Sequence, residues 1–251
     1  MKTKLSRILK KGKALYLAYD QGLEHGPSKD FNDKNIDPLY IIEIAKKGKY
    51  QGIVFQKGIA EKYNKEIRKS KIPLILKLNG KTSLFEGEPI ARQLCTVKEA
   101  VKLGAKAVGY TIYIGSKHES TMFQEFEKIE REAHSKAIPV ITWIYPRGKS
   151  IKNDTSREMM SYSARTALEL GADIVKLKYG NNPDDLKWTV KSAGKTKVVV
   201  AGGIKKSESE FLKQAKDIMK AGAIGLAVGR NVWQHPQPFK ITEKIQKIIW
   251  S

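Results

Sequence analysis

The segment Leu170-Gly-Ala-Asp-Ile-Val-Lys-Leu-Lys178 joins a helical pattern, through a glycine, to a short apolar run typical of a β-strand. The same order recurs at Leu103-Gly-Ala-Lys-Ala-Val108 and at Ala221-Gly-Ala-Ile-Gly-Leu226. Glycine is common just past a helix, where the chain adopts a left-handed conformation. The sequence predicts such helix ends at Gly48, Gly104, Gly171, Gly194 and Gly222. One helix–glycine–strand unit repeated along the chain predicts an α/β protein.

The alternation of strands and helices extends along the whole chain. Apolar runs that predict strands lie at 14–19, 52–56, 74–78, 107–112, 140–145, 173–178, 197–201 and 224–228. Helical patterns lie at 38–47, 97–103, 121–136, 157–170, 183–192, 207–221 and 238–249, and the polar unit at 57–71 is the weakest. The strand runs are continuously apolar, which is typical of parallel strands covered on both faces. We therefore expect a (β/α)₈ barrel formed by residues 1–251 as one domain, with a short basic helix at about 3–11. A doubly wound sheet is the alternative.

Composition limits the classes of partner. The formal charge is +21, from 47 Lys and Arg against 26 Asp and Glu, and such a surface attracts anions. The lysines are spread along the chain without interleaved aromatic residues, so phosphorylated small molecules are favoured over a specific nucleic-acid function. No apolar run is long enough to cross a membrane. A single cysteine, Cys95, cannot form an internal disulfide and suits the reducing cytoplasm. The four histidines are scattered, and no metal site is predicted.

Two lysines stand inside the predicted strand at 173–178. Residues two apart along a strand point to the same face, so Lys176 and Lys178 project together. A lysine in an apolar or cationic setting has a lowered pKa and becomes a nucleophilic amine, as a Schiff base requires. A solvated edge strand is the alternative interpretation, and strand alternation alone does not choose between the two lysines.

Polar residues gather at the predicted carboxyl ends of the strands, where barrels of this class build their active sites. The last two strands run into Ala201-Gly-Gly-Ile-Lys205 and Val228-Gly-Arg230. Glycines let backbone N–H groups approach an anion closely, and a basic residue in each loop adds positive charge. The pair of loops predicts a phosphate site formed by Gly202, Gly203, Lys205, Gly229 and Arg230.

Three further residues complete a possible Schiff-base site. Tyr145 is the candidate proton carrier, Trp143 shares its face of the strand as a pocket wall, and Asp20 stands at the end of the first strand. In such chemistry the lysine attacks a ketone and the protonated imine withdraws electrons while a neighbouring acid or base moves a proton. Ordinary roles are open for each: a packing tyrosine, a core tryptophan and a turn aspartate.

With these features the chain resembles the archaeal-type class I fructose-1,6-bisphosphate aldolases of the DeoC/FbaB aldolase family. The matching stretches include Tyr145-Pro-Arg-Gly148 and Gly229-Arg-Asn-Val-Trp-Gln234, and the others lie at 17–27, 52–63, 73–82, 107–113 and 173–179. The resemblance implies reversible cleavage of fructose 1,6-bisphosphate to dihydroxyacetone phosphate and glyceraldehyde 3-phosphate, without a metal, in a homo-oligomer. It also implies that Lys176 rather than Lys178 forms the Schiff base, that Tyr145 transfers the proton and that Asp20 is the family's first-strand acid.

The chain departs from this family at a few positions. Gln21 stands where the family usually has histidine, Ile204 replaces a proline, and Gly180-Asn181-Asn182 replaces Thr-Gly-Asp. A related activity on the same scaffold, synthesis of 2-amino-3,7-dideoxy-D-threo-hept-6-ulosonate, is one alternative. A polyanion-binding protein built on an inactive barrel is the other, since the charge alone would suffice for it.

Overall fold

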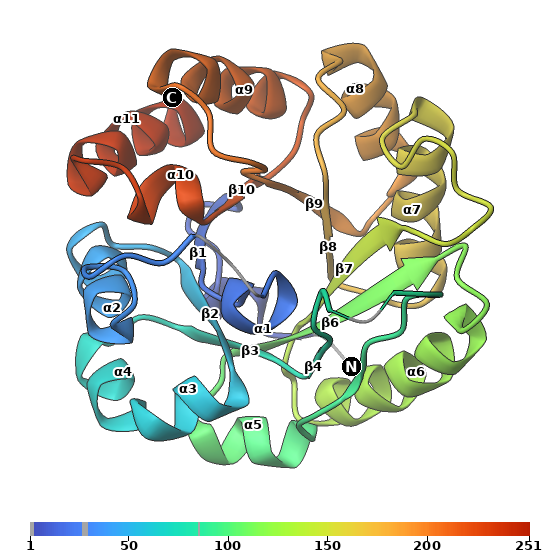
Figure 1. Cartoon of the computed structure of the whole chain (residues 1–251), viewed down its shortest axis with the longest axis horizontal. Coiled ribbons are helices and arrows are strands. Elements are labelled where there is room, and N and C mark those ends of the chain that lie inside the picture. Colours follow the sequence, from blue (N-terminus) through green and yellow to red (C-terminus); the bar gives the residue numbers. More distant parts are fainter. Residues whose placement is uncertain (1–2, 27–29, 85) are drawn as a thin grey trace.

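Eight parallel strands of the described residues close into a barrel, in the order β1-β10-β9-β8-β7-β6-β3-β2 (Figure 1). The computed structural model describes residues 3–26, 30–84 and 86–251. The barrel strands are β1 (Ala14–Ala18), β2 (Gly52–Gln56), β3 (Leu74–Lys77), β6 (Ala107–Ile114), β7 (Val140–Pro146), β8 (Ile174–Leu177), β9 (Lys197–Ala201) and β10 (Gly225–Val228). Each predicted strand is confirmed, with ends that differ by at most two residues.

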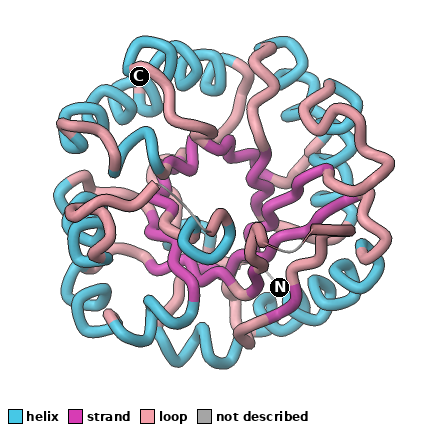
Figure 2. Tube along the Cα trace, viewed as in Figure 1, coloured by secondary structure: helices cyan, strands magenta, loops and turns pink. Residues whose placement is uncertain are grey.

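Helices form a ring outside these strands, which line the inner circle in Figure 2. The larger helices are α2 (Pro38–Lys47), α5 (Val97–Leu103), α6 (Glu119–Ser135), α7 (Arg157–Glu169), α8 (Pro183–Ser192), α9 (Glu208–Lys220) and α11 (Pro238–Trp250). The weak unit at 57–71 forms two short helices, α3 (Lys57–Lys62) and α4 (Asn64–Ser70). The predicted (β/α)₈ barrel is therefore confirmed. No helix among the described residues is long and apolar enough to cross a bilayer.

Burial on both faces explains the continuous apolar strands. One cluster of buried residues lies between the strands and the helices, and a second fills the inside of the barrel. Along β1, Leu15 and Leu17 belong to the outer cluster, whereas Ala14, Tyr16 and Ala18 belong to the inner one. Neither face of such a strand meets water, so a polar residue within it must find a partner inside the protein.

The predicted helix at 3–11 is wrong in extent. Only Leu5–Arg7 form one 3₁₀ turn, η1, and the chain then reverses through a bridge between Lys10 and Lys13. Ile8 is fully buried in the inner cluster, and its carbonyl accepts a hydrogen bond from the Tyr16 hydroxyl at 3.0 Å. The chain therefore leaves the helical conformation after Arg7, and Ile8 is buried at the amino-terminal end of the barrel.

The predicted glycine caps hold at four of five positions. Gly104, Gly171, Gly194 and Gly222 have φ between +58° and +92°. Gly48 has φ −77°, and the left-handed position falls on Lys49 at φ +48°. A would-be Cβ at Gly48 lies 2.7 Å from the Tyr50 ring, so close packing rather than φ requires glycine there.

Short elements that the sequence did not reveal lie near the carboxyl ends of the strands. These are α1 (Gln21–Glu24) after β1, α10 (Arg230–Trp233) after β10, and the antiparallel pair β4 (Asn79–Gly80) with β5 (Arg92–Gln93). They shape the surface over the end of the barrel where the predicted site residues gather.

Candidate active site

A cavity of about 550 Å³ opens at the carboxyl ends of the strands. Its walls come from β7, β8 and the loops after β1, β9 and β10. The lining includes the predicted residues Tyr145, Lys176, Lys178, Gly202, Gly203, Gly229 and Arg230. It also includes Gln21, Glu24, His25, Tyr113, Arg147 and Lys206, which the prediction did not assign to the site. Residues distant in the sequence thus meet around one space.

Lys176 is the buried amine of this cavity. It lies within β8 and is 8% exposed, with its Nζ 5.2 Å from the centre of the Trp143 ring. Burial lowers the pKa of Lys176 below its usual value, and the carboxylates of Asp20 and Glu24 oppose the shift. A lowered pKa makes the neutral, nucleophilic amine more abundant near neutral pH.

The pairing of β7 with β8 places each lysine beside an aromatic ring. Trp143 is the register partner of Lys176, and two residues further along Tyr145 lies 5.9 Å from the Lys178 Nζ. Trp143 is 2% exposed and lies beneath Lys176. Lys178 is half-buried and forms an ion pair with Asp154. The two lysines therefore differ, since one is buried under the cavity and the other already has a carboxylate partner.

Tyr145 is partly buried beside the same groups. Burial raises the pKa of the Tyr145 hydroxyl, and the nearby carboxylate of Asp20 raises it further. Its ring stacks on that of Tyr113 with centroids 6.5 Å apart, and the Arg147 guanidinium lies over both rings. The protonated hydroxyl is thus the stable form, able to donate a hydrogen bond or a proton.

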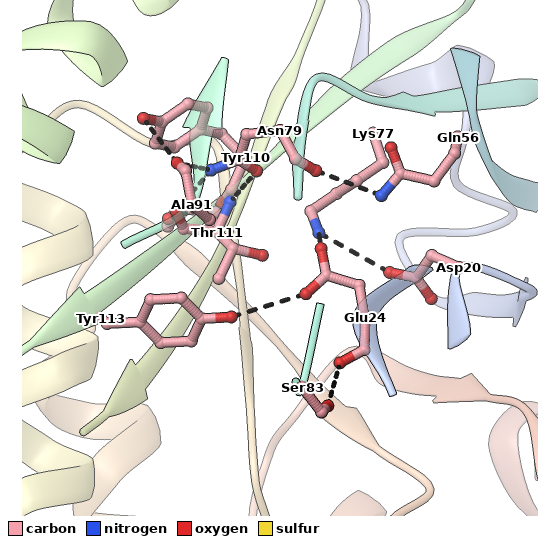
Figure 3. A network of polar contacts seen from close by, with 11 residues as sticks. Asp20, Glu24, Gln56, Lys77, Asn79, Ser83, Ala91, Tyr110, Thr111 and Tyr113 are labelled. Carbon is pink, nitrogen blue, oxygen red and sulfur yellow. Dashed lines mark hydrogen bonds and ion pairs between the residues drawn. The ribbon is translucent and has the colours of Figure 1, made fainter. Parts of the chain in front are cut away.

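A buried ion-pair network lies next to Lys176 (Figure 3). The Lys77 ammonium at the end of β3 contacts Glu24 Oε1 at 2.7 Å and Asp20 Oδ2 at 3.8 Å. The Lys77 side chain is 1% exposed, and the two carboxylates are each 10% exposed. Burial by itself would raise the pKa of Asp20, but the charges of Lys176 and Lys77 lower it below its usual value. Asp20 is therefore ionised and shared between two lysines.

The two predicted phosphate loops meet at one side of the cavity. Gly203 has φ +76°, a conformation that favours glycine, and Gly229 precedes α10. A Cβ at Gly229 would lie 2.5 Å from the Gln21 side-chain nitrogen. The Arg230 guanidinium is half-buried and forms an ion pair with Asp30 at 3.2 Å. Lys205 is exposed and does not line the cavity, whereas its neighbour Lys206 does.

Asn231 joins the two loops and was missed by the sequence analysis. Its side-chain amide donates to the carbonyls of Gly202 and Ile204 at 3.0 and 2.9 Å, and its Oδ1 accepts from the Lys206 N–H at 2.8 Å. An asparagine after Gly-Arg carries no local signal for this role, because all three partners lie about 25 residues away in the sequence.

The departures from the family pattern have local explanations. Asn181 adopts φ +63°, which asparagine tolerates, and Asn182 caps α8 by accepting from the N–H groups of Asp184 and Asp185. Ile204, in place of a proline, is 68% exposed. Gln21 lines the cavity, and its Oε1 is buried without a hydrogen-bond partner among the described residues.

Comparisons with known proteins agree with this geometry. A family model for the DeoC/LacD family of aldolases matches residues 14–235. The class 1 fructose-bisphosphate aldolase of Thermoproteus tenax is 49% identical over 96% of this chain and 91% of its own length. The class 1 fructose-bisphosphate aldolase of Halobacterium salinarum is 42% identical over 98% of this chain and 94% of its own.

A solved structure is similar over the whole barrel. It is an archaeal fructose-1,6-bisphosphate aldolase whose catalytic lysine is covalently bound to the carbinolamine intermediate of the substrate. The TM-score is 0.93 at 47% identity, over 99% of this chain and 98% of that one.

Proposed function

Because the chain belongs to the DeoC/LacD family of aldolases, we propose that it reversibly cleaves fructose 1,6-bisphosphate to dihydroxyacetone phosphate and glyceraldehyde 3-phosphate through an imine on Lys176. The observation that carries the proposal is the buried Lys176 amine, with its pKa lowered by burial, in the same cavity as Tyr145 and two glycine loops.

The reaction follows from the groups around the cavity. The neutral Lys176 amine adds to the C2 ketone, and water leaves to give a protonated imine. The bond between C3 and C4 then breaks: its electron pair moves into the imine to give an enamine, and the C4 hydroxyl passes its proton to the proton carrier as the aldehyde leaves. The enamine takes up a proton at C3, and water hydrolyses the imine to release dihydroxyacetone phosphate and the free Lys176 amine. Tyr145 is the proposed proton carrier, and Asp20 stabilises the positive charge of the imine. Such chemistry needs no metal, because the imine itself accepts the electrons.

Cationic groups at two parts of the cavity fit a bisphosphate. The loops of Gly203, Gly229 and Arg230 are the proposed site of one phosphate. Arg147 and Lys178, beside Tyr145, are the proposed partners of the other, and Lys206 lies between the β8 and β9 loops with its Nζ 3.3 Å from Asn181. Trp143 supports the Lys176 side of the pocket from below.

The test is reduction with borohydride in the presence of fructose 1,6-bisphosphate, followed by peptide mapping. We expect an adduct on Lys176, its loss in Lys176→Met, and its retention in the matched variant Lys178→Met. An adduct on Lys178 in the wild type would overturn the assignment of the nucleophile. A folded protein that forms no adduct and releases no triose phosphate would overturn the function.

We also infer that residues 1–251 act as one aldolase domain in a cytoplasmic homo-oligomer. The family match extends from the first barrel strand past the last one, which supports the domain boundary. Size-exclusion chromatography with light scattering measures the assembly directly.

A further inference from the structure

A second buried lysine, Lys77, lies beside the site, and the reaction above does not use it. Lys77 is more deeply buried than Lys176, does not line the cavity, and has its Nζ 5.4 Å from the same Trp143 ring that carries Lys176. Both ammonium groups therefore lie close to the same indole ring. Burying an ammonium costs free energy unless it is paired with a carboxylate.

Two carboxylates, those of Glu24 and Asp20, lie next to the Lys77 ammonium. Glu24 binds it directly at 2.7 Å, and Glu24 is fixed in turn by contacts on either side, with the Tyr113 hydroxyl 3.5 Å from its Oε2 and Ser83 Oγ donating to its backbone carbonyl. Asp20 lies 3.8 Å from Lys77 and also interacts with Lys176. Lys77 thus joins the two carboxylates (Figure 3), and Lys176 acts on Asp20 as a second positive charge.

The charge on Lys176 changes during imine formation. The ammonium first gives up a proton to become the neutral amine, a C–N bond then forms to give a neutral carbinolamine, and the C–O bond breaks to give the protonated imine. Overall, one ammonium and one ketone give one protonated imine and one water. The Lys176 nitrogen near Asp20 is therefore positively charged at the start and at the end of these steps but neutral in between.

We propose that Glu24 holds the Lys77 side chain beside Asp20, so that this cation keeps Asp20 ionised while Lys176 passes through its neutral forms. Lys77 and Glu24 are thus positioning residues, and the inference rests on the proposed function of Lys176. Without Lys77, a buried Asp20 beside a neutral amine would take up a proton and would have no charge to offer the imine. With it, the carboxylate is already in place when the positive charge returns.

Other titratable groups face the set but do not replace Lys77. Glu24 and Asp20 both act on Tyr145, and Arg147 lies over the rings of Tyr113 and Tyr145. His25 acts on Asp20 from the exposed rim, as a weaker influence than either lysine. Lys77 is the one of these cations, among the described residues, that touches Glu24 and also lies within 4 Å of Asp20.

The test compares the pH dependence of kcat/KM in Lys77→Met with that in wild type and in Lys77→Arg. In Lys77→Met we expect kcat/KM to fall on the acid side of the profile (a new acid limb), by about tenfold for each pH unit, as Asp20 becomes protonated. At higher pH, where Asp20 is ionised, kcat/KM should stay within about threefold of the wild-type value. Lys77→Arg restores the charge and should lack this limb. Should Lys77→Met not fold, as judged by circular dichroism, Lys77→Gln takes its place with the same expectation.

A purely structural role for Lys77 would give a loss of the same size at every pH, and that result would overturn the inference. Asp20→Asn supplies a second check, because the double variant with Lys77→Met should show no acid limb. Borohydride trapping on wild-type Lys176 is measured in parallel. Failure to trap in wild type refutes the proposed function, whereas trapping in wild type with no new limb in Lys77→Met refutes only the role of Lys77.

Glu24→Gln tests the anchor separately. The amide still offers an oxygen to Lys77 but leaves Asp20 to balance two cations, so Lys77 moves toward Asp20 and competes with the imine. We expect at least about a fivefold loss of kcat/KM that does not depend on pH. A Glu24→Gln enzyme indistinguishable from wild type would refute the anchoring role.

Discussion

A single buried amine accounts for most of the chemistry proposed for this protein. Lys176 and Lys178 have nearly identical neighbours in the sequence, yet only Lys176 lies over Trp143 with its ammonium removed from water. Lys178 is paired with Asp154 in a more open position. Because reactivity depends on the neutral amine, this difference in surroundings supports the proposal that Lys176 is the nucleophile.

The lowered pKa of Lys176 predicts how trapping responds to pH. Burial destabilises the ammonium, so the neutral amine is reached below the ordinary value of 10.5. The rate of adduct formation should rise with pH and level off before 10.5. The measurement is reductive trapping with cyanoborohydride across a pH series. Asp20→Asn removes an opposing carboxylate and should move the midpoint to lower pH, and a midpoint at or above 10.5 in wild type would contradict the assignment.

Gly109 is the residue on which the Trp143 ring depends. A Cβ at position 109 would lie 2.0 Å from the ring, which therefore could not keep its place beneath Lys176. Gly109→Ala should cost about 1–3 kcal/mol of unfolding free energy and should lower kcat by at least about tenfold. Urea unfolding and steady-state kinetics measure the two effects. Retention of full activity would show that the position of Trp143 is unimportant.

At the scale of elements, the register between neighbouring strands and loops assembles the site. Pairing of β7 with β8 sets each lysine beside its ring, and the loops after β9 and β10 are tied together through Asn231. Each contact joins segments that are separate in the sequence. The glycines of the loops give them their shape, but Asn231 fixes one loop relative to the other.

Replacing Asn231 should weaken phosphate binding. Asn231→Ala leaves two carbonyls and one N–H without their partner, at a cost of about 1–3 kcal/mol, and the loosened loops should raise KM by about tenfold. The matched control is Asn182→Ala, which removes the cap of α8 at a cost of about 1 kcal/mol and leaves KM unchanged. Equal effects of both variants on KM would indicate general loosening rather than a specific tie.

At the scale of the whole molecule, the charge of +21 bears on how an anionic substrate arrives. Positively charged groups line the mouth of the cavity, among them Arg147, Lys178, Lys206 and Arg230. A basic surface around a cleft raises the local concentration of anions, and salt screens the effect.

The KM for fructose 1,6-bisphosphate should therefore rise severalfold between about 0.02 and about 0.5 M salt, whereas kcat should stay nearly constant. Steady-state kinetics at constant pH measures this. Substituting exposed lysines remote from the cavity, Lys213→Gln and Lys216→Gln, lowers the net charge and serves as the control, with a smaller effect expected. A KM that does not change with salt concentration would argue against electrostatic steering of the substrate. Tight RNA binding at physiological salt would favour the polyanion-binding alternative.

The repeating pattern of the chain was enough to predict the barrel and to propose its main reactive groups. Repeated helix–Gly–Ala–strand units and apolar strands define eight parallel strands, because local hydrogen bonding and burial on both faces leave periodic patterns in the chain. The rule that parallel strands present their carboxyl ends together predicted that Lys176, Lys178, Tyr145 and the two glycine loops meet at one end of the barrel. The choice of Lys176 over Lys178 came from the resemblance to the aldolase family.

Only the tertiary structure decided which of these groups touch. The barrel brought Lys77 at the end of β3 against Asp20 and Glu24 of the segment after β1 in one ion-pair network, and it placed Lys206 rather than Lys205 in the lining of the cavity. At the amino terminus, residues 5–7 form one 3₁₀ turn and Ile8 packs inside the barrel, instead of the predicted helix. Such contacts leave no periodic trace in the sequence, because their free energy comes from burial and charge pairing between residues distant along the chain.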